Sequence, residues 1–339
     1  MEFKQALEQV LQGKDLAYAD MLLLMQQVMA GELTSVQIAG LVIALRQKGE
    51  SVDEITAAAT VMRQLSTKVE IADKTHLIDT CGTGGDGIQT FNVSTVSAFV
   101  AAAAGAKVAK HGGRSVSSTC GSADVLEALG VNVNQTPEQV AQNVAEIGIG
   151  FMFAPNHHSA MKHAAPVRRE LGVRTIFNLL GPLTNPASAK RQVMGVFDKS
   201  LTIKLAQVLK NLGSDHVLVV HGADGMDEIS FTGDTFVAEL KNGQVNEYTL
   251  NPTQFGLNTH ALKSIQIENA AQSKAMILDV LSSNTQNLAA REIVLLNAGA
   301  AIYVAGVENS LQAGILKAAQ VIDTGAALAK LEALKAAST

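Results

Sequence analysis

The first 67 residues carry apolar side chains at helical spacing, with polar residues between them. Met21–Met29 is almost entirely apolar, and a wide apolar stripe runs along residues 36–45. Thr34 and Ser51 each precede a Gln or Glu by three residues, which is the spacing of a capping box at a helix start. The pattern predicts that this region is entirely helical. So apolar a block forms either core or a subunit interface, and we favour the interface.

From Thr75 onward, short apolar runs alternate with longer helical runs, which predicts a parallel sheet covered by helices on both faces. Strands are expected at residues 77–78, 106–109, 131–133, 149–153, 192–196 and 216–220. Helices are expected at residues 95–104, 123–129 and 200–212, and from Thr136, where a cap, Pro137 and Gln139 stand together.

Two segments depart from this alternation. Residues 156–186 are rich in His, Arg and Pro and carry a helical apolar pattern, so we expect them to return to the helical block. Residues 229–250 have a β pattern with a hairpin turn at Asn242-Gly243. The chain from Ser273 is predicted to be mostly helix. The fold class is therefore α/β, with a mostly parallel central sheet flanked by helices plus a smaller all-helical domain.

Composition narrows the class of protein. The 339 residues are 47% hydrophobic and 17% charged, which is enough to bury a large core. The net charge of −5 argues against a general nucleic-acid binder. No signal-peptide pattern and no long apolar run free of polar residues is visible, so we expect no membrane partner. Cys81 and Cys120 are expected to be reduced thiols of a cytoplasmic protein.

The candidate chemistry begins at the Gly-rich turn Asp79–Gly87, which follows the first predicted strand. Four glycines in six positions let the backbone adopt positive φ and approach a ligand closely. A helix start with good capping residues follows at Asn92–Thr95. Backbone amides next to a helix N-terminus suit a phosphate group, although a Gly-rich connector followed by simple capping would have the same sequence.

Two further loops follow predicted strands. Lys110–Ser118 combines cations, glycines and hydroxyls, which suits an anion, and Gly121–Asp124 then opens a helix. Asp224, Asp227 and Glu228 would repel one another unless a cation lies between them, and hard oxygen ligands suit Mg²⁺. The alternatives are a solvated basic loop and an acidic turn in water.

Taken together, the three loops fit a diphosphate-bearing substrate with Mg²⁺. The carboxyl ends of parallel strands meet at one edge of a sheet, where ligands bind in folds of this class. The glycines lack the Lys-Ser/Thr that follows them in a P-loop, so a P-loop NTPase fits poorly.

These motifs resemble those of the anthranilate phosphoribosyltransferases, and the resemblance covers nearly the whole chain. The motifs that carry it are Gly82–Asp86, Asn92–Thr95, Lys110–Gly112, Gly121–Asp124, Asp224–Glu228, His157–Lys162 and Phe177–Pro186. The resemblance implies the nucleoside phosphorylase/phosphoribosyltransferase type of fold. It further implies a helical dimerisation domain (1–70 with 165–188), an α/β domain (71–164 with 189–339) that binds phosphoribosyl pyrophosphate, and a homodimer.

The implied reaction belongs to tryptophan biosynthesis: anthranilate displaces pyrophosphate from phosphoribosyl pyrophosphate, giving N-(5′-phosphoribosyl)anthranilate. The resemblance places the donor on Gly82, Gly85, Asp86, Thr90, Asn92, Ser94, Thr95, Lys110, Ser118 and Ser122. It places anthranilate on Gly82, His111, Gly113, His158 and Arg168, and magnesium on Ser94, Asp227 and Glu228. It assigns no residue as a general base, because the amine proton becomes acidic only as the C–N bond forms.

One position departs from the family pattern. Gly113 stands where the family usually has an Asn that helps to bind anthranilate, so we expect weaker anthranilate binding than in a relative with Asn. Two rival functions remain open at this point. A pyrimidine nucleoside phosphorylase would share the architecture but use inorganic phosphate, and a non-enzymatic relative would bind nucleic acid.

Overall fold

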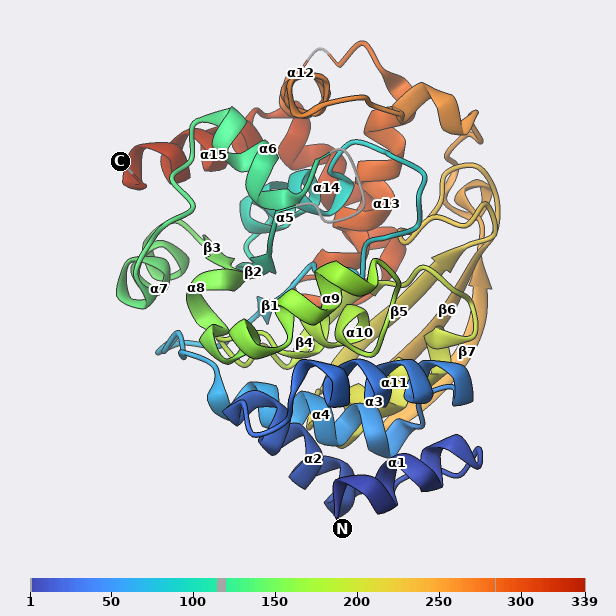
Figure 1. Ribbon diagram of the computed structural model, residues 1–339. Coiled ribbons are helices and arrows are strands. Elements are labelled where there is room, and N and C mark those ends of the chain that lie inside the picture. Colours follow the sequence, from blue (N-terminus) through green and yellow to red (C-terminus); the bar gives the residue numbers. More distant parts are fainter. Residues whose placement is uncertain (1, 115–119, 284, 339) are drawn as a thin grey trace.

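The computed structural model describes residues 2–114, 120–283 and 285–338. Its first 65 residues form four helices, as the pattern predicts, at one end of the molecule (Figure 1). Thr34 and Ser51 both close capping boxes, which confirms those helix starts. The four helices are α1 (Phe3–Leu11), α2 (Tyr18–Ala30), α3 (Ser35–Lys48) and α4 (Val52–Leu65).

The segment after residue 153 returns to these helices, as expected. It consists of α8 (Ala154–His157), η1 (Ser159–His163), α9 (Ala165–Leu171), α10 (Phe177–Leu180) and η2 (Gly181–Leu183). Leu41 of α3 and Val167 of α9 belong to one buried cluster, which also includes Leu205 from α11 (Leu201–Asn211). The N-terminal helices are therefore packed against the sheet-bearing part of the chain through a continuous core.

The sheet-bearing part holds two hydrogen-bonded sheets. The first is parallel and consists of β1 (Leu77–Ile78), β2 (Lys107–Gly112) and β3 (Ile149–Phe153) in that order. The second consists of β4 (Arg191–Gly195), β5 (His216–Gly222), β6 (Thr235–Lys241) and β7 (Gln244–Leu250). In it β4 and β5 are parallel and the later pairs are antiparallel. A parallel bridge between Asp79 and Gln192 joins the two sheets.

Helices from the middle and the end of the chain cover the sheets (Figure 1). They are α5 (Val93–Ala103), α6 (Ser122–Leu129), α7 (Pro137–Glu146), α11, α12 (Ala270–Leu281), α13 (Leu288–Ala305), α14 (Leu311–Asp323) and α15 (Ala326–Ala337), with the short η3 (Pro252–Phe255) and η4 (Leu262–Ile265). Helix α13 is long and apolar enough to cross a membrane, but 83% of that stretch is buried inside the protein, where it packs against α5 and α14.

Two expectations about strands are wrong. Residues 131–133 form no strand, although Val131 and Val133 are buried on either side of exposed Asn132. The Asn132 amide, which a strand would use in a ladder, donates instead to the Ser338 hydroxyl at 3.0 Å, and no described strand pairs with this segment. The β pattern over 229–250 begins as a strand only at Thr235, while the expected hairpin forms at Asn242-Gly243 with positive φ at both residues.

Candidate active site

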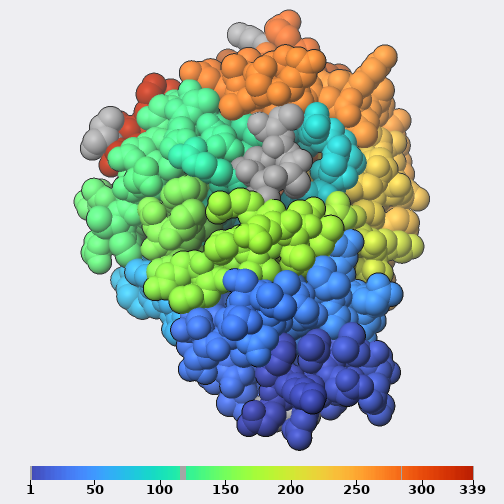
Figure 2. Space-filling model, viewed as in Figure 1, coloured from blue at the N-terminus to red at the C-terminus, as the bar shows by residue number. Residues whose placement is uncertain are grey.

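The three predicted loops meet around one cavity of about 360 Å³. Most of the residues that the resemblance assigns to substrates or metal line it. They are Gly82, Gly85, Asp86, Thr90, Asn92, Ser94, Lys110, His111, Gly113, Ser122, Arg168, Asp227 and Glu228. In Figure 2 the segment around α9 and α10 separates the blue N-terminal helices from the cyan Gly-rich segment. The cavity thus lies where the returning helical segment faces the strand ends.

The Gly-rich loop is shaped by backbone that only glycine adopts readily. Gly84 and Gly85 have φ of 62° and 77°. The loop is held on the sheet by the Thr83 amide, which donates to the Gly195 carbonyl at the end of β4 at 2.9 Å. The Gly84 amide donates to Asp227 Oδ2 at 2.8 Å. The loop and the acidic turn are therefore in direct contact.

Lys110 supplies a buried cation to this cavity and is only 3% exposed. Its ammonium donates to the Thr80 carbonyl at 2.5 Å and to Ser94 Oγ at 3.2 Å. Ser94 lies in the first turn of α5, and its amide donates to Glu228 Oε1 at 3.1 Å. One helix start, one strand end and one acidic loop thus converge within hydrogen-bond distance.

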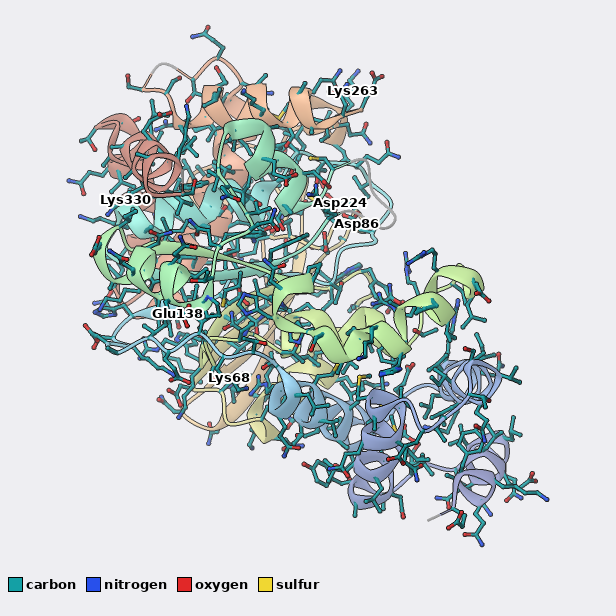
Figure 3. All side chains as sticks on the ribbon, turned by 60° about the vertical axis from the view of Figure 1, so that its left-hand side comes forward. Lys68, Asp86, Glu138, Asp224, Lys263 and Lys330 are labelled. Carbon is teal, nitrogen blue, oxygen red and sulfur yellow. The ribbon has the colours of Figure 1, made fainter. Side chains whose placement is uncertain are left out.

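Two carboxylates of the acidic loop, those of Asp227 and Glu228, are half-buried at this point. Burial and the neighbouring Asp86 raise the pKa of Asp227, and burial and Asp227 raise the pKa of Glu228 well above its usual value. Asp86 and Asp224, labelled in Figure 3, mark the Gly-rich loop and the acidic loop. Asp224 instead accepts hydrogen bonds from Ser230 and Thr232, so it shapes its own turn.

The donor set fits Mg²⁺. Burial and neighbouring carboxylates raise the pKa of both groups although Lys110 opposes the rise at Glu228, and a divalent cation would favour their charged forms. Among the described residues, no group of three or more His, Cys, Asp and Glu could hold a metal. Two carboxylates and a hydroxyl leave the remaining positions to water and phosphate oxygens, which is the usual arrangement for Mg²⁺.

The opposite wall of the cavity suits a flat aromatic acid. Phe177 and Pro182 give it apolar surface, and the Arg168 guanidinium lies over the Phe177 ring at 5.8 Å from its centroid. Burial lowers the pKa of Arg168. A Cβ added to Gly113 would have no atom of a described residue within 4 Å, so the missing side chain leaves room among them.

His111 and His158 form a neutral pair beside this wall. Burial lowers the pKa of His111 to about 3 and that of His158 to about 4, with each further lowered by a neighbouring histidine. His111 Nδ1 lies 3.2 Å from the Gly181 carbonyl, and its Nε2 lies 3.2 Å from His158 Nε2. Because a carbonyl only accepts, His111 carries its proton on Nδ1 and accepts at Nε2 from His158.

Comparison with known proteins identifies the family to which this chain belongs. Two family models match the chain: a glycosyl transferase family helical bundle domain over residues 4–66 and a glycosyl transferase family α/β domain over residues 74–328. The chain is 65% identical to anthranilate phosphoribosyltransferase of Methylobacillus flagellatus, covering 99% of this chain and 98% of that protein. The chain belongs to the anthranilate phosphoribosyltransferase family.

Solved structures of family members agree over the whole fold. Anthranilate phosphoribosyltransferase from Thermus thermophilus has a TM-score of 0.92 at 41% identity, covering 98% of both chains. The Saccharomyces cerevisiae enzyme, solved in complex with phosphoribosyl pyrophosphate and Mg, has a TM-score of 0.88 at 27% identity, covering 99% of this chain and 97% of that one. The family resemblance and the expected fold class are confirmed.

Among the described residues that the family resemblance assigns, Thr95 and His158 do not line the cavity. Thr95 points into the α5 core, where its hydroxyl is buried without a hydrogen-bond partner in the structure. His158 stands behind His111 and reaches the cavity only through it. Ser118 lies outside the described residues. Asn92 lines the cavity, but its amide group already bonds to the Cys120 carbonyl and the Ser273 hydroxyl.

Other lining residues were missed from the sequence, including Thr83, Phe177, Asn178 and Pro182. The last three lie in a motif that carries the family resemblance, but the apolar pattern of the surrounding segment predicted only a return to the helical block. The thiol of Cys81 also lines the cavity, and burial raises its pKa, so it stays protonated and is a poor nucleophile.

A larger and more open groove of about 860 Å³ lies over α12, lined by residues such as His260, Met276 and Leu288. None of the three predicted loops contributes to it. Among the described residues, the three loops therefore meet only in the smaller cavity.

Proposed function

We propose that this chain transfers the phosphoribosyl group of phosphoribosyl pyrophosphate to the amine of anthranilate, releasing pyrophosphate. The observation that carries the proposal is the convergence of the Gly84 amide, Lys110 and the pair Asp227-Glu228 on one cavity. Backbone amides, a cation and a site for a divalent metal are the groups that a leaving diphosphate needs. Family membership and the yeast complex with the same donor support it.

The donor residues have separate tasks in this proposal. Amides of the Gly-rich loop and of the α5 start bind diphosphate and phosphate oxygens, with Ser94 and Ser122 supplying hydroxyls. Lys110 balances negative charge as the bond between ribose C1 and the diphosphate oxygen breaks. Thr90, Asp86 and Asn92 line the same stretch of wall and hold the ribose and the loop in position.

We propose that Ser94, Asp227 and Glu228 hold Mg²⁺. When bound, the metal supplies positive charge that stabilises the leaving pyrophosphate. The protein holds both carboxylates in place before binding: Asp227 by the Gly84 amide and Glu228 by the Ser94 amide. The adjacent Ile229 is fixed by Asn297 from α13, whose side chain bonds to both its amide and its carbonyl.

The acceptor side of the cavity positions anthranilate for attack. Arg168 faces its carboxylate, and Phe177 gives its ring an apolar surface. The amine nitrogen forms a bond to ribose C1 as the C1–O bond breaks, and the nitrogen then loses a proton. His111 is neutral and its Nε2 already accepts from His158, so the pair serves to orient the wall and is not assigned as a general base.

We further propose two domains with the boundaries given by the resemblance, 1–70 with 165–188 and 71–164 with 189–339. The family models, which match residues 4–66 and 74–328, support a division near residue 70. A homodimer through the N-terminal helices is supported by exposed apolar side chains there, among them Leu23, Val36 and Ile43. Two free cysteines, Cys81 and Cys120, support a cytoplasmic location.

Anthranilate fluorescence tests the reaction directly. The proposal expects fluorescence to fall when phosphoribosyl pyrophosphate is added with Mg²⁺, and expects pyrophosphate to appear in equal amount. No change with that donor, together with phosphate-dependent cleavage of a pyrimidine nucleoside, would instead support the phosphorylase alternative. No observation at the site favours that alternative or nucleic-acid binding.

A further inference from the structure

Asp79 lies at the seam between the two sheets. Ile78 still pairs with Val108 of β2, but the backbone then turns toward β4. The Asp79 amide donates to the Arg191 carbonyl, and the Asp79 carbonyl accepts from the Val193 amide, each at 3.1 Å. The backbone therefore pairs with β2 at Ile78 and with β4 at Asp79, where the Gly-rich loop begins.

After this change of partner, the Ala109 carbonyl and the His111 amide of β2 no longer have β1 beside them to pair with. Side chains replace it. Asp79 Oδ1 accepts from the His111 amide at 3.1 Å, and Oδ2 accepts from Asn185 Nδ2 at 2.7 Å. Asn185 Nδ2 also donates to the Ala109 carbonyl at 2.9 Å, while its Oδ1 accepts from the Ala187 amide. Two side chains thus complete the ladder at the end of β2.

Two residues at this end of β2 belong to the site. Lys110 and His111, at the end of β2, point into the donor half and the acceptor half of the cavity. Asn185 lies where the chain returns from the helical segment to β4. The Asp79 carboxylate therefore contacts the β2 end and the returning segment, and its own backbone leads into the Gly-rich loop.

We propose that Asp79 is a positioning residue, which fixes the donor half and the acceptor half of the cavity relative to each other. It does not line the cavity and acts through Lys110 and His111. The proposal rests on the proposed transferase function, because its readout is the rate of that reaction.

The chemistry of the seam requires a carboxylate. Asp79 is only 1% exposed, and burial raises its pKa to about 6, while the charge of Lys110 opposes that rise. Burying a carboxylate is costly, so it is a poor way to gain stability alone. An Asn has the same shape, but its NH₂ would face either the His111 amide or the Asn185 NH₂, and two donors cannot pair.

Asp79→Asn tests the proposal, with Glu292→Gln as the matched control. Glu292 is also a buried carboxylate, 5% exposed, that accepts hydrogen bonds from Asn258 and His260 away from the cavity. We expect Asp79→Asn to lower kcat by about 10- to 100-fold, since roughly 1 Å of misplacement has such an effect. The KM of each substrate should change by less than about threefold, because each half-site stays intact. Glu292→Gln should lower Tm and leave kcat unchanged.

Amide hydrogen exchange without substrates provides a second readout. The His111 amide should exchange faster in Asp79→Asn, while the Val108 amide should not change. This result is independent of the substrate assignment, so an inactive wild-type enzyme would refute the proposed function without deciding the role of Asp79. If Asp79→Asn fails to fold, Asn185→Ala breaks the same network and should show the same loss of kcat at nearly constant KM.

A folded Asp79→Asn enzyme with kcat within twofold of the wild type would overturn the proposal. So would an equal loss of kcat in Glu292→Gln, since the effect would then follow stability alone. An unchanged kcat in Asn185→Ala would decide against it where the Asp variant cannot be measured.

Discussion

Replacing Gly195 with Ala should separate the acidic loop from the strand that supports it. Gly195 is the last residue of β4, and a Cβ built on it would lie 1.5 Å from the carbonyl oxygen of Asp227. That neighbour is backbone, so no side-chain rotation can relieve the collision. The same glycine carbonyl also accepts from the Thr83 amide, so the Gly-rich loop is affected as well.

The size of the effect follows from this distance. Cβ atoms essentially never approach a heavy atom closer than 3.0 Å, so the loop or the strand must move by at least about 1.5 Å (3.0 minus 1.5). A shift of about 1 Å in catalytic groups can cost 100-fold in rate, or roughly 2.7 kcal/mol of transition-state stabilisation. We therefore expect Gly195→Ala to lower kcat/KM for the donor by about 100-fold or more and to weaken Mg²⁺ binding.

Calorimetric Mg²⁺ titration and initial rates at saturating anthranilate would measure both effects. Gly233→Ala is the control, because no described atom lies within 4 Å of a Cβ built there and its φ is not in the left-handed region. It should keep the wild-type rate and Mg²⁺ affinity. A Gly195→Ala enzyme with wild-type Mg²⁺ affinity and rate would refute the argument that this close approach positions the acidic loop.

Three further predictions follow from single features of the structure. Gly113→Asn should lower the KM for anthranilate and leave that of the donor unchanged, because the added side chain enters open space; no gain in anthranilate affinity would count against this account. Since burial lowers their pKa values to about 3 and 4, His111 and His158 should stay neutral from pH 8 down to pH 5.5, so ¹⁵N NMR should show the protonated Nδ1 of His111 and no titration in that range. Ser51→Ala should destabilise the protein by about 0.5–2 kcal/mol in denaturant titrations without changing kcat, because it removes one side of the α4 capping box; an unchanged unfolding midpoint would contradict this.

Much of the fold could be predicted because local signals and tertiary packing agree. The capping boxes at Thr34, Ser51 and Thr136 mark helix starts that the structure retains. The strand-end loops could also be placed together, since carboxyl ends of parallel strands share one edge of a sheet. Lys110 and Glu228 are close for this reason, although 117 residues separate them (228 minus 110, less one).

The rest depends on contacts between segments distant in sequence. Val131 and Val133 alternate with a polar residue, as in a strand, and both are buried. Only the fold shows that no described strand pairs with them. Thr95 resembled a ligand in the family motif, yet the turn of α5 directs it into the core. Asp79 and Asn185 lie in motifs that the sequence analysis singled out, but no pattern predicts their pairing, which exists only where the backbone at Asp79 changes strand partners.

The central claim is that Asp227 and Glu228 hold the metal through which the protein binds the diphosphate. Calorimetric titration of phosphoribosyl pyrophosphate, with and without Mg²⁺, tests it in the wild type and in the double variant Asp227→Ala/Glu228→Ala. We predict that Mg²⁺ strengthens the binding of phosphoribosyl pyrophosphate to the wild type and has no effect on its binding to the double variant. Equal Mg²⁺-dependent affinity in both proteins would contradict the account.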